Sequence, residues 1–203
     1  MPTSDQLHQL AELAAEGIHP DDQMPFGRPW SAVSPAERAR SVLQWHWRTL
    51  AELKPESWTL GFTVLRNGVV VGTQDLSAAD FGIGRSVHTG SWLGQRFQGQ
   101  GIGTQMRAAV LEFAFTGLEA VEATTSAFTD NPASQRVSEK LGYLDNGSRR
   151  YVVADQPRRE RGFLLARERW HCPIEVGIDN LEPCLPMLGA RAEQAPEARM
   201  TKQ

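Results

Sequence analysis

The amino-acid sequence predicts a mixed α/β domain in which a central, mostly antiparallel sheet is flanked by helices. Two helix patterns come first, and a strand pattern with a period of two and a tight turn follows them. The remaining elements alternate as strand, helix, strand, helix and strand. This order favours an antiparallel sheet that contains one parallel segment.

The first helix is predicted by a capping box and an apolar face. Thr3 with Gln6 can satisfy the first free N–H groups, and Gly17 is a typical helix stop. The apolar residues between them fall on one side of a helix: Leu7, Leu10, Ala11 and Ala14. A loop rich in Pro, Asp and Gly, from His19 to Ser31, comes next.

The second helix has an equally clear start. Ser34 can cap it, Pro35 suits its first position, and Glu37 can complete the capping box. The helix is expected to end before Pro55. Its apolar stripe is predicted to contain Val42, Leu43, Trp47, Leu50 and Leu53.

A β-hairpin is predicted from Trp58 to Leu76. Large apolar residues alternate with small or polar ones, and Asn67-Gly68 supplies the residues that a type I′ turn needs. A loop is expected from Ser77 to Arg85. The later elements are predicted at Val87–Leu93 (strand), Thr104–Thr116 (helix), Ala120–Phe128 (strand), Pro132–Leu141 (helix), Tyr151–Val153 and Phe163–Ala166 (strands).

The end of the chain lacks a regular pattern. From His171 onward no helical or strand periodicity continues, so the sequence suggests a domain at 1–170 and a C-terminal tail at 171–203. Within that tail, Ala192–Gln203 is rich in Ala and Glu and is expected to be disordered.

Composition excludes several function classes. Net charge is −3 and pI about 6.0, which argues against nucleic acid or a membrane surface as partner. Apolar runs are too short for a membrane span, and a secretory pattern is missing at the start. Cys172 and Cys184 form no metal-binding pair, so no metal is expected and a cytoplasmic location is favoured.

The stretch from Gln98 to Thr104 predicts an anion-binding loop. It contains Gln98-Gly99-Gln100-Gly101-Ile102-Gly103 between a strand and an amphipathic helix. Glycines allow close approach of the backbone, and the first helical turn offers free N–H groups to a phosphate. By itself the stretch is equally compatible with a connector that binds nothing.

Two other phosphate loops fit poorly. A P-loop needs Lys before Ser or Thr after its last glycine, whereas Gly103 is followed by Thr104-Gln105. The dinucleotide fingerprint needs a different glycine spacing and a later acidic residue, which is missing at the end of a following parallel strand.

Two motifs together resemble those of the GCN5-related N-acetyltransferase (GNAT) family. The Gln98–Gly103 loop matches the family's Q/R-x-x-G-x-G/A pattern. Asn131-Pro132-Ala133-Ser134, with Lys140-Leu141-Gly142-Tyr143 after it, is similar to a second family segment. Ser91-Trp92-Leu93-Gly94 before the loop resembles the RimJ/RimL-like branch, which includes actinobacterial acyl- and succinyltransferases.

The resemblance implies a GNAT acyl-CoA N-acyltransferase fold and acyl-CoA as cofactor, either acetyl-CoA or another acyl-CoA such as succinyl-CoA. Leu93 and Gly94 would offer backbone hydrogen bonds to the pantetheine arm. The pyrophosphate would be held by main-chain N–H groups of Gln98, Gly99, Gln100, Gly101, Ile102, Gly103 and Thr104. Asn131 and Ser134 would lie near the thiol, although Asn131 is also a good helix cap.

The catalytic residues are harder to assign from the resemblance. Relatives often carry a tyrosine where this chain has Ser138, so Ser134 is the first candidate for thiol contact or proton donation. His88 stands near a glutamate of RimL-like proteins and could act as base, although a surface histidine explains it equally well. Asp75 is a second candidate, for amine binding or water-mediated deprotonation, but a solvated charge at the strand end is favoured for it. We expect direct attack of a primary amine, from a small molecule or a protein, on the thioester.

Three further expectations follow from the resemblance. Relatives begin with a strand before the first helix, whereas only Met1-Pro2-Thr3 precede it here, so either the chain starts late or the sheet lacks its first edge strand. Relatives are often homodimers, which this chain's aromatic content permits. A CoA-binding regulatory module without catalysis remains the alternative function.

Overall fold

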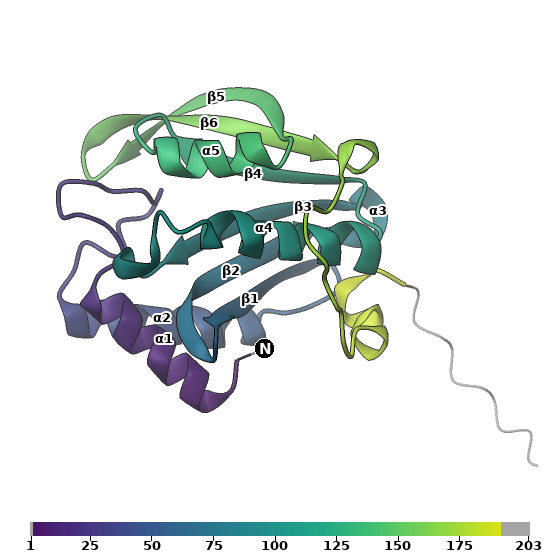
Figure 1. Cartoon of the computed structure of the whole chain (residues 1–203), viewed down its shortest axis with the longest axis horizontal. Helices are drawn as coiled ribbons and strands as arrows, with labels where there is room; N and C mark the ends of the chain where they lie inside the picture. Colours follow the sequence, from purple (N-terminus) through teal and green to yellow (C-terminus); the bar gives the residue numbers. More distant parts are fainter. Residues whose placement is uncertain (1, 192–203) are drawn as a thin grey trace, which may run out of the picture.

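The computed structural model describes residues 2–191, which form one six-stranded sheet with helices on both faces (Figure 1). The strand order is β1-β2-β3-β4-β6-β5, and only β3 and β4 pair in parallel. The strands are β1 (Ser57–Arg66), β2 (Val69–Ala79), β3 (Ser86–Leu93), β4 (Glu122–Phe128), β5 (Leu144–Val153) and β6 (Gln156–Ala166). The predicted fold class is confirmed.

Helices α1 (Ser4–Glu16) and α2 (Pro35–Ala51) form a pair, and α1 also packs on β2. Both predicted capping boxes are present, on Thr3 and on Ser34. The predicted apolar face of α1 is buried in a cluster that also contains Val42 of α2 and Val70 of β2.

The predicted apolar stripe of α2 is partly wrong. Trp47 and Leu50 are 56% and 42% exposed, whereas Val42 and His46 are buried. The inward face runs through Val42, Trp45 and His46, at spacings of three and four residues. The apolar residues of this helix lie on more than one of its sides. Its inward face also carries polar groups, because that face lines a cavity.

The β1–β2 hairpin forms as predicted around its turn. Asn67 and Gly68 both have positive φ, at 51° and 78°, as a type I′ turn requires. The loop expected at Ser77–Arg85 is shorter, because β2 continues to Ala79 and α3 (Phe81–Gly84) adds one helical turn. β1 is an edge of the sheet, and no strand precedes α1 in the range 2–191.

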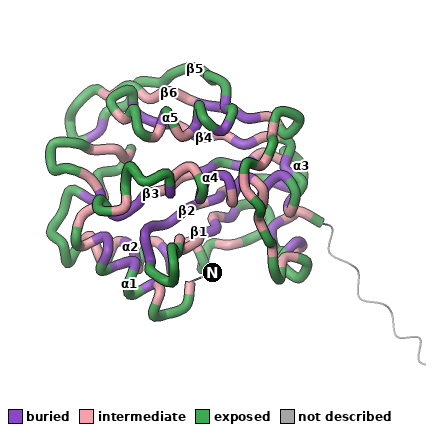
Figure 2. Tube along the Cα trace, viewed as in Figure 1, coloured by how far each residue is buried: buried purple, intermediate pink, exposed green. Residues whose placement is uncertain are grey.

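The other face is covered by α4 (Ile102–Glu112), a π-helical turn at Phe113–Gly117, and α5 (Pro132–Lys140). They enclose the main core with the sheet, and Figure 2 shows buried stretches along β2, β3 and α4. Helix α4 begins two residues earlier than predicted, at the glycines of the proposed anion loop.

The last two strands are far longer than the sequence predicted. β5 pairs with β6 in an antiparallel hairpin, which extends the sheet beyond β4. Nearly all of β5 is exposed, so its sequence shows no alternation between buried and exposed residues. Without that alternation the sequence shows no strand pattern. Only the ends of the two strands were predicted, Tyr151–Val153 in β5 and Phe163–Ala166 in β6.

The segment 171–191 packs on the domain instead of extending from it. Leu185 and Leu188 are buried in the main core, and the Trp58 Nε1–H donates a 2.9 Å hydrogen bond to the Leu188 carbonyl. Gly117 also lies against Leu181, whose Cδ2 is 2.8 Å from an ideal Cβ position. Long-range packing therefore orders a segment that local periodicity did not predict; the disorder expected at Ala192–Gln203 concerns residues outside the described range.

Removing the side chain of Leu188 should measurably destabilise the protein. We expect Leu188→Ala to lower the free energy of unfolding by about 2–5 kcal/mol, because a buried leucine is replaced by a cavity. Met187→Ala is the matched control, because Met187 is 54% exposed and should change stability by less than about 0.5 kcal/mol. Urea unfolding of both variants measures this, and equal midpoints would show that the segment does not contribute to the core.

Candidate active site

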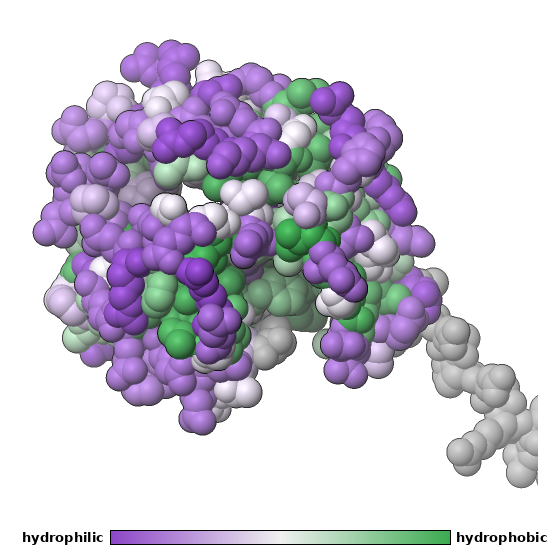
Figure 3. Space-filling view, in the orientation of Figure 1, coloured by the Kyte–Doolittle hydropathy of each residue, from purple (hydrophilic) through white to green (hydrophobic). Residues whose placement is uncertain are grey.

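The parallel strands β3 and β4 pair over only three residues and then diverge. Their pairs are Ser86 with Glu122, Val87 with Ala123, and His88 with Thr124. β4 continues beyond this point in register with β6, while β3 continues with β2. Figure 3 shows this face hollowed between the segments that carry α4 and α5.

The backbone of β3 has hydrogen-bonding groups free to face the open side. Gly94 N–H bonds the Val71 carbonyl across the β2 ladder at 3.0 Å. Hydrogen-bonded and non-hydrogen-bonded pairs alternate along an antiparallel ladder. The main-chain N–H and C=O of Trp92 therefore also point toward β2, whereas those of Ser91 and Leu93 point toward β4, which diverges. The Leu93 carbonyl accepts a 3.0 Å hydrogen bond from Gln98 Nε2. The N–H of Leu93 and the N–H and C=O of Ser91 remain directed toward the gap.

Gly94 has a packing role at the end of β3. Its N–H is bonded to Val71, and its carbonyl accepts the Phe97 N–H at 2.9 Å. A Cβ at this position would lie 2.4 Å from Leu13 Cδ1, so glycine lets α1 approach the end of β3. The second lone pair of the carbonyl is the main-chain acceptor that is left for the expected contact with pantetheine.

The predicted anion loop closes onto the start of α4. Gly101 is the N-cap with φ 81°, no side chain caps the helix, and Gly99 has φ 72°. A Cβ on either glycine would meet no atom within 4 Å, so both border open space. An uncapped helix N-terminus beside open space is suited to bind an anion.

The two ends of the predicted loop are used within the protein. The Gln98 side chain bonds the Ile18 and Leu93 carbonyls, and its N–H bonds Gln95. The N–H of Thr104 bonds the Gly101 carbonyl at 3.1 Å. In the described range, the N–H groups without a backbone acceptor lie between them, at Gly99, Gln100, Gly101, Ile102 and Gly103. These groups fit the pyrophosphate of CoA.

Asn131 caps α5, as its position before Pro132 predicted. Its Oδ1 accepts the Ser134 N–H at 3.1 Å. Ser134 lies in the first turn and is half-buried. Ser138, which stands where relatives carry tyrosine, is buried and donates its hydroxyl to the Ser134 carbonyl at 3.3 Å. Ser138 is therefore occupied inside the helix.

A cavity of about 540 Å³ lies on the α1–α2 side of the sheet. Its floor is formed by β1, β2 and β3, and its walls by α1, α2 and the loop that precedes α2. The lining includes the aromatic residues Phe26, Trp30, Trp45 and Trp92, and the polar or small residues Thr63, Thr73, Asp75, Gly90 and Ser91. Asp75 is the only carboxylate in this lining.

The loop that carries Phe26 and Trp30 is held at both ends. His19 Nε2 and Ser31 Oγ lie 2.7 Å apart, and Arg158 of β6 donates to the Met24 carbonyl at 3.1 Å. The rings of Phe26 and Trp30 are 5.3 Å apart, which makes one continuous aromatic wall. These contacts fix the wall in place over the sheet.

The Asp75 carboxylate lies at the centre of the cavity floor. Asp75 is opposite Gly61 on β1 and opposite Gly90 on β3, so no neighbouring side chain covers it. Its Oδ1 accepts the Thr73 hydroxyl at 3.3 Å. Burial raises the pKa of Asp75 to about 7, while the Thr73 hydrogen bond and the charge of Arg107 act in the opposite direction. A carboxylate with this pKa can accept a proton near neutral pH.

Thr63 has a hydroxyl without a protein partner. Its Oγ1 is inaccessible to solvent and makes no hydrogen bond in the described structure. Thr63 is opposite Thr73 and lines the same cavity as Asp75. Buried hydroxyls are normally satisfied, so this one is an exception among the described residues.

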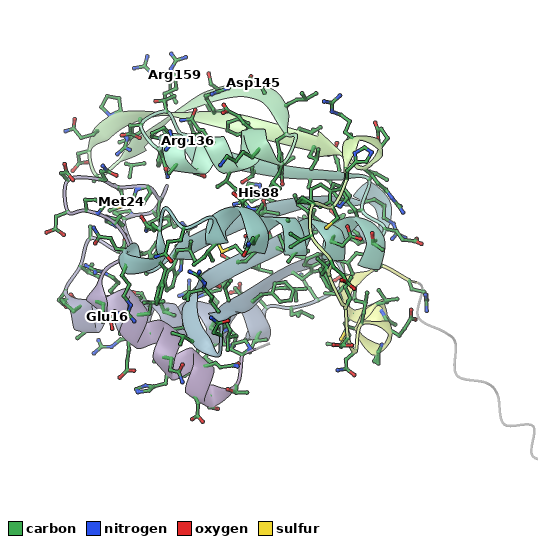
Figure 4. The ribbon with its side chains drawn as sticks, in the orientation of Figure 1. Glu16, Met24, His88, Arg136, Asp145 and Arg159 are labelled. Carbon is green, nitrogen blue, oxygen red and sulfur yellow. The ribbon has the colours of Figure 1, made fainter. Side chains whose placement is uncertain are left out.

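His88 lies on the same strand face as Gly90, but two residues from it and outside the cavity lining. Figure 4 shows it on β3, and its Nδ1 lies 3.1 Å from Thr124 Oγ1. Partial desolvation lowers the pKa of His88, the charge of Arg107 adds to this, and Glu160 opposes it. The imidazole is therefore neutral near pH 7.

The structure brings together only part of the predicted site. Asp75 and the Ser91–Leu93 backbone lie on adjacent strands, whereas Ser134 is on α5 and makes no hydrogen bond with Asp75 or His88 in the described range. The sequence suggests an acceptor pocket between the hairpin, the first two helices and the loop between them, and the aromatic residues of that region do line the cavity: Phe26, Trp30, Trp45 and His46. Sequence reasoning missed the buried Arg107 of α4. Arg107 was detectable, because it interrupts the apolar face made by Gly103, Leu111 and Ala114.

No group of three or more His, Cys, Asp or Glu residues in the described range could hold a metal ion. No helix within residues 2–191 has the length and apolar character to cross a bilayer.

A sheet split between its parallel strands, with an anion loop on one side and a carboxylate cavity on the other, defines an acyl-CoA-dependent acyltransferase. The chain belongs to the GNAT acetyltransferase family, because the model for the acetyltransferase (GNAT) domain matches residues 2–144. The chain is therefore an acetyltransferase of this family.

Solved structures of acetyltransferases share the fold. RimL, a ribosomal L7/L12 α-N-protein acetyltransferase in complex with coenzyme A, is 17% identical with a TM-score of 0.62, covering 81% of this chain and 90% of that one. The ribosomal-protein-S5-alanine acetyltransferase from Vibrio fischeri is 15% identical with a TM-score of 0.58, covering 84% and 93%. A variant of the spermidine N-acetyltransferase SpeG from Vibrio cholerae is 14% identical with a TM-score of 0.59, covering 82% and 93%.

Proposed function

We propose that this protein transfers an acyl group from acyl-CoA to a primary amine that enters the cavity above Asp75. The observation that carries the proposal is the position of β3. On one side of this strand lies the Asp75 cavity, and on the other lies the gap that leads to the Gly99–Gly103 loop. An amine and a thioester can therefore meet at Ser91, between the two compartments.

The cofactor contacts follow from the free main-chain groups. The N–H groups of Gly99 to Gly103 would hold the pyrophosphate, and Asn131 and Ser134, at the start of α5, would lie near the thiol. The N–H groups of Ser91 or Leu93 would polarise the acyl carbonyl. When bound, acyl-CoA supplies the activated acyl group.

Asp75 is the proposed general base. An amine arrives mainly as its ammonium form, and a carboxylate with a pKa of about 7 can take the proton that must leave before nitrogen attacks. His88, neutral near pH 7 and on the same face of β3, is the second candidate. The aromatic wall would hold the body of the amine.

The proposal also covers the acyl donor, the amine acceptor and the oligomeric state. Acetyl-CoA is the expected donor, with succinyl-CoA as the second donor to be tested. The acceptor is a primary amine of a small molecule or a protein, and a cytoplasmic location and a homodimer are compatible with the family resemblance. The second candidate function is a CoA-binding module without catalysis, which is favoured only by Ser138 at the usual tyrosine position.

A thiol-release assay tests the proposal directly. Acetyl-CoA and succinyl-CoA are each offered with a panel of amines and peptides, and we expect amine-dependent release of free CoA. A thermal shift with acyl-CoA but no release with any amine would favour the non-catalytic module, while no shift at all would remove CoA binding. Ser134→Ala with His88→Gln tests the two secondary candidates. Trapping an acyl group on Ser134 or on either cysteine would contradict direct attack.

A further inference from the structure

Arg107 is a buried cation that the proposed function does not yet use. It is 4% exposed on α4 and makes none of the ion pairs in the range 2–191. Its partners are all neutral, with Nε 3.4 Å from Gln74 Oε1, Nη1 3.1 Å from Thr125 Oγ1, and Nη2 3.1 Å from Ser91 Oγ. These three bonds use three of the five guanidinium N–H groups, which leaves two for another acceptor.

Such a group is costly in the free protein. A guanidinium keeps its charge at any physiological pH, so it cannot escape burial by losing a proton. Three neutral acceptors compensate its lost hydration only in part. A buried cation of this kind is suited to stabilise a negative charge that appears only when a ligand is bound or transformed.

The guanidinium lies where β3 and β4 separate. Ser91 belongs to β3 and Thr125 to β4, and the last pair of these strands is His88 with Thr124. Arg107 therefore joins the two strands just beyond that pair. It is five residues along α4 from Ile102, a rise of about 7.5 Å from the anion loop. The reactive end of a molecule anchored at the loop would reach this position.

Ser91 connects Arg107 to the acceptor cavity. Arg107 donates to Ser91 Oγ, which leaves the Ser91 hydroxyl hydrogen free to be donated elsewhere. Thr125 differs, because its hydroxyl donates to the Thr89 carbonyl at 2.9 Å. Ser91 is also among the residues that line the cavity, while its hydroxyl lies with Gln74 and Arg107 on the α4 face, toward the gap.

The field of Arg107 already acts on the neighbouring titratable groups. These are Asp75 on β2, His88 on β3 and Tyr143 after α5, and its positive charge lowers the pKa of each. Burial acts on Asp75 and Tyr143 in the opposite direction and is larger. No carboxylate close to Arg107 quenches this field by an ion pair in the described range.

We propose that Arg107, acting through the Ser91 hydroxyl, stabilises the thiolate that leaves acyl-CoA when the amide bond forms. The amine lone pair forms the new C–N bond, and the electron pair of the breaking C–S bond goes to sulfur. The ammonium proton goes to Asp75 before attack, the second nitrogen proton passes to water as the amide forms, and the thiolate takes a proton from water after release. Ser91 is the contacting group and Arg107 the positioning residue, and the inference rests on the proposed acyl transfer.

The thiol of bound CoA gives a direct test. Ultraviolet absorbance of the thiolate is followed against pH with free CoA bound to the wild type, Arg107→Met, Ser91→Ala and, as control, Asp145→Asn on the exposed β5–β6 hairpin. We expect the wild type and Asp145→Asn to lower the pKa of the bound thiol by about one or more, a ten-fold change in thiolate fraction. Arg107→Met and Ser91→Ala should restore the value of free CoA. An unchanged thiol pKa in these two variants overturns the inference.

Kinetics and stability separate this role from a structural one. Arg107→Met should lower kcat by roughly 10- to 100-fold with little change in the KM of acyl-CoA, and the double variant with Ser91→Ala should lose no more. It should also raise the urea midpoint of the free protein, because an uncompensated charge is removed. A lower midpoint together with lower kcat would mean a structural role and overturn the inference.

Acyl preference supplies the last discriminating result. If Arg107→Met loses activity only with succinyl-CoA and keeps it with acetyl-CoA, Arg107 binds an acyl carboxylate and the thiolate role is wrong. Equal losses with both donors support it. Wild type that fails to bind CoA contradicts the proposed function itself, whereas normal binding and turnover with an unperturbed thiol contradict only the inference about Arg107.

Discussion

Asp75→Asn should reduce kcat/KM for the amine by about 10²- to 10⁴-fold near pH 8, the loss typical of a missing general base. The substitution keeps size and shape but cannot accept a proton. In the wild type, kcat/KM should rise with pH through an apparent pKa of about 7, because only the ionised carboxylate is active. In Asp75→Asn this rise should disappear, and the dissociation constant of CoA should not change.

The same carboxyl makes stability depend on pH. Burial raises the pKa of Asp75 to about 7 in the folded state, whereas in the unfolded chain it lies near 4. Between these values the folded protein binds more protons than the unfolded one, so stability falls as pH rises from about 4 to about 7. Asp75→Asn should remove this fall and gain a few kcal/mol at most, roughly 4 or less, above pH 7.

Two controls make the Asp75 result decisive. Asp145→Asn removes an exposed carboxylate that is bonded to Arg161 on the β5–β6 hairpin, and it should leave kcat/KM within about two-fold, as for surface changes away from a site. Asp75→Asn that retains activity within about ten-fold of wild type, with an unchanged pH profile, would move the base elsewhere. His88→Gln would then be the variant to compare.

Gly101→Val should lower CoA affinity by about 100-fold, which corresponds to about 2.7 kcal/mol. Gly101 is the N-cap of α4 at φ 81°, a conformation that a β-branched residue strongly disfavours. The new side chain would also project from the loop whose N–H groups are proposed to hold the pyrophosphate. Isothermal titration with CoA measures the loss.

Gly147 offers a matched control for this substitution. It has the same φ of 81° and, like Gly101, no atom within 4 Å of an ideal Cβ, but it lies in the β5 bulge. Gly147→Val should therefore cost a similar amount of stability, about 1–3 kcal/mol, and leave CoA affinity unchanged. Equal effects of the two variants on affinity would show that the loop does not bind CoA and that only strain was measured.

Local patterns predicted much of this fold because they depend on neighbours in the chain. The capping boxes of α1 and α2 and the Asn67-Gly68 turn formed as predicted. Each needs only residues within one turn of each other, so its free energy is decided locally. Strand β5 failed this kind of prediction because its residues are exposed and pair with β6 without an apolar face.

The candidate site also has one part that follows from local sequence and one part that depends on residues far apart in the chain. Gln98–Gly103 and Asn131-Pro132-Ala133-Ser134 identified the family and the cofactor side, since a loop and a helix start are contiguous segments. On the acceptor side the sequence indicated the region but not its arrangement around Asp75, because Trp45, Gly61 and Asp75 come from three different elements.

The sequence by itself determined the starts of α1, α2 and α5, the hairpin turn and the family. Only the tertiary structure decided that Asp75 is half-buried under an aromatic wall, that Gly94 lies against Leu13, and that Arg107 joins diverging strands beside Ser91. The physical reason is that pKa and desolvation depend on what surrounds a charge in space. For Asp75 and Arg107, those surroundings are brought together by sheet register and helix packing, over distances in sequence that no local pattern spans.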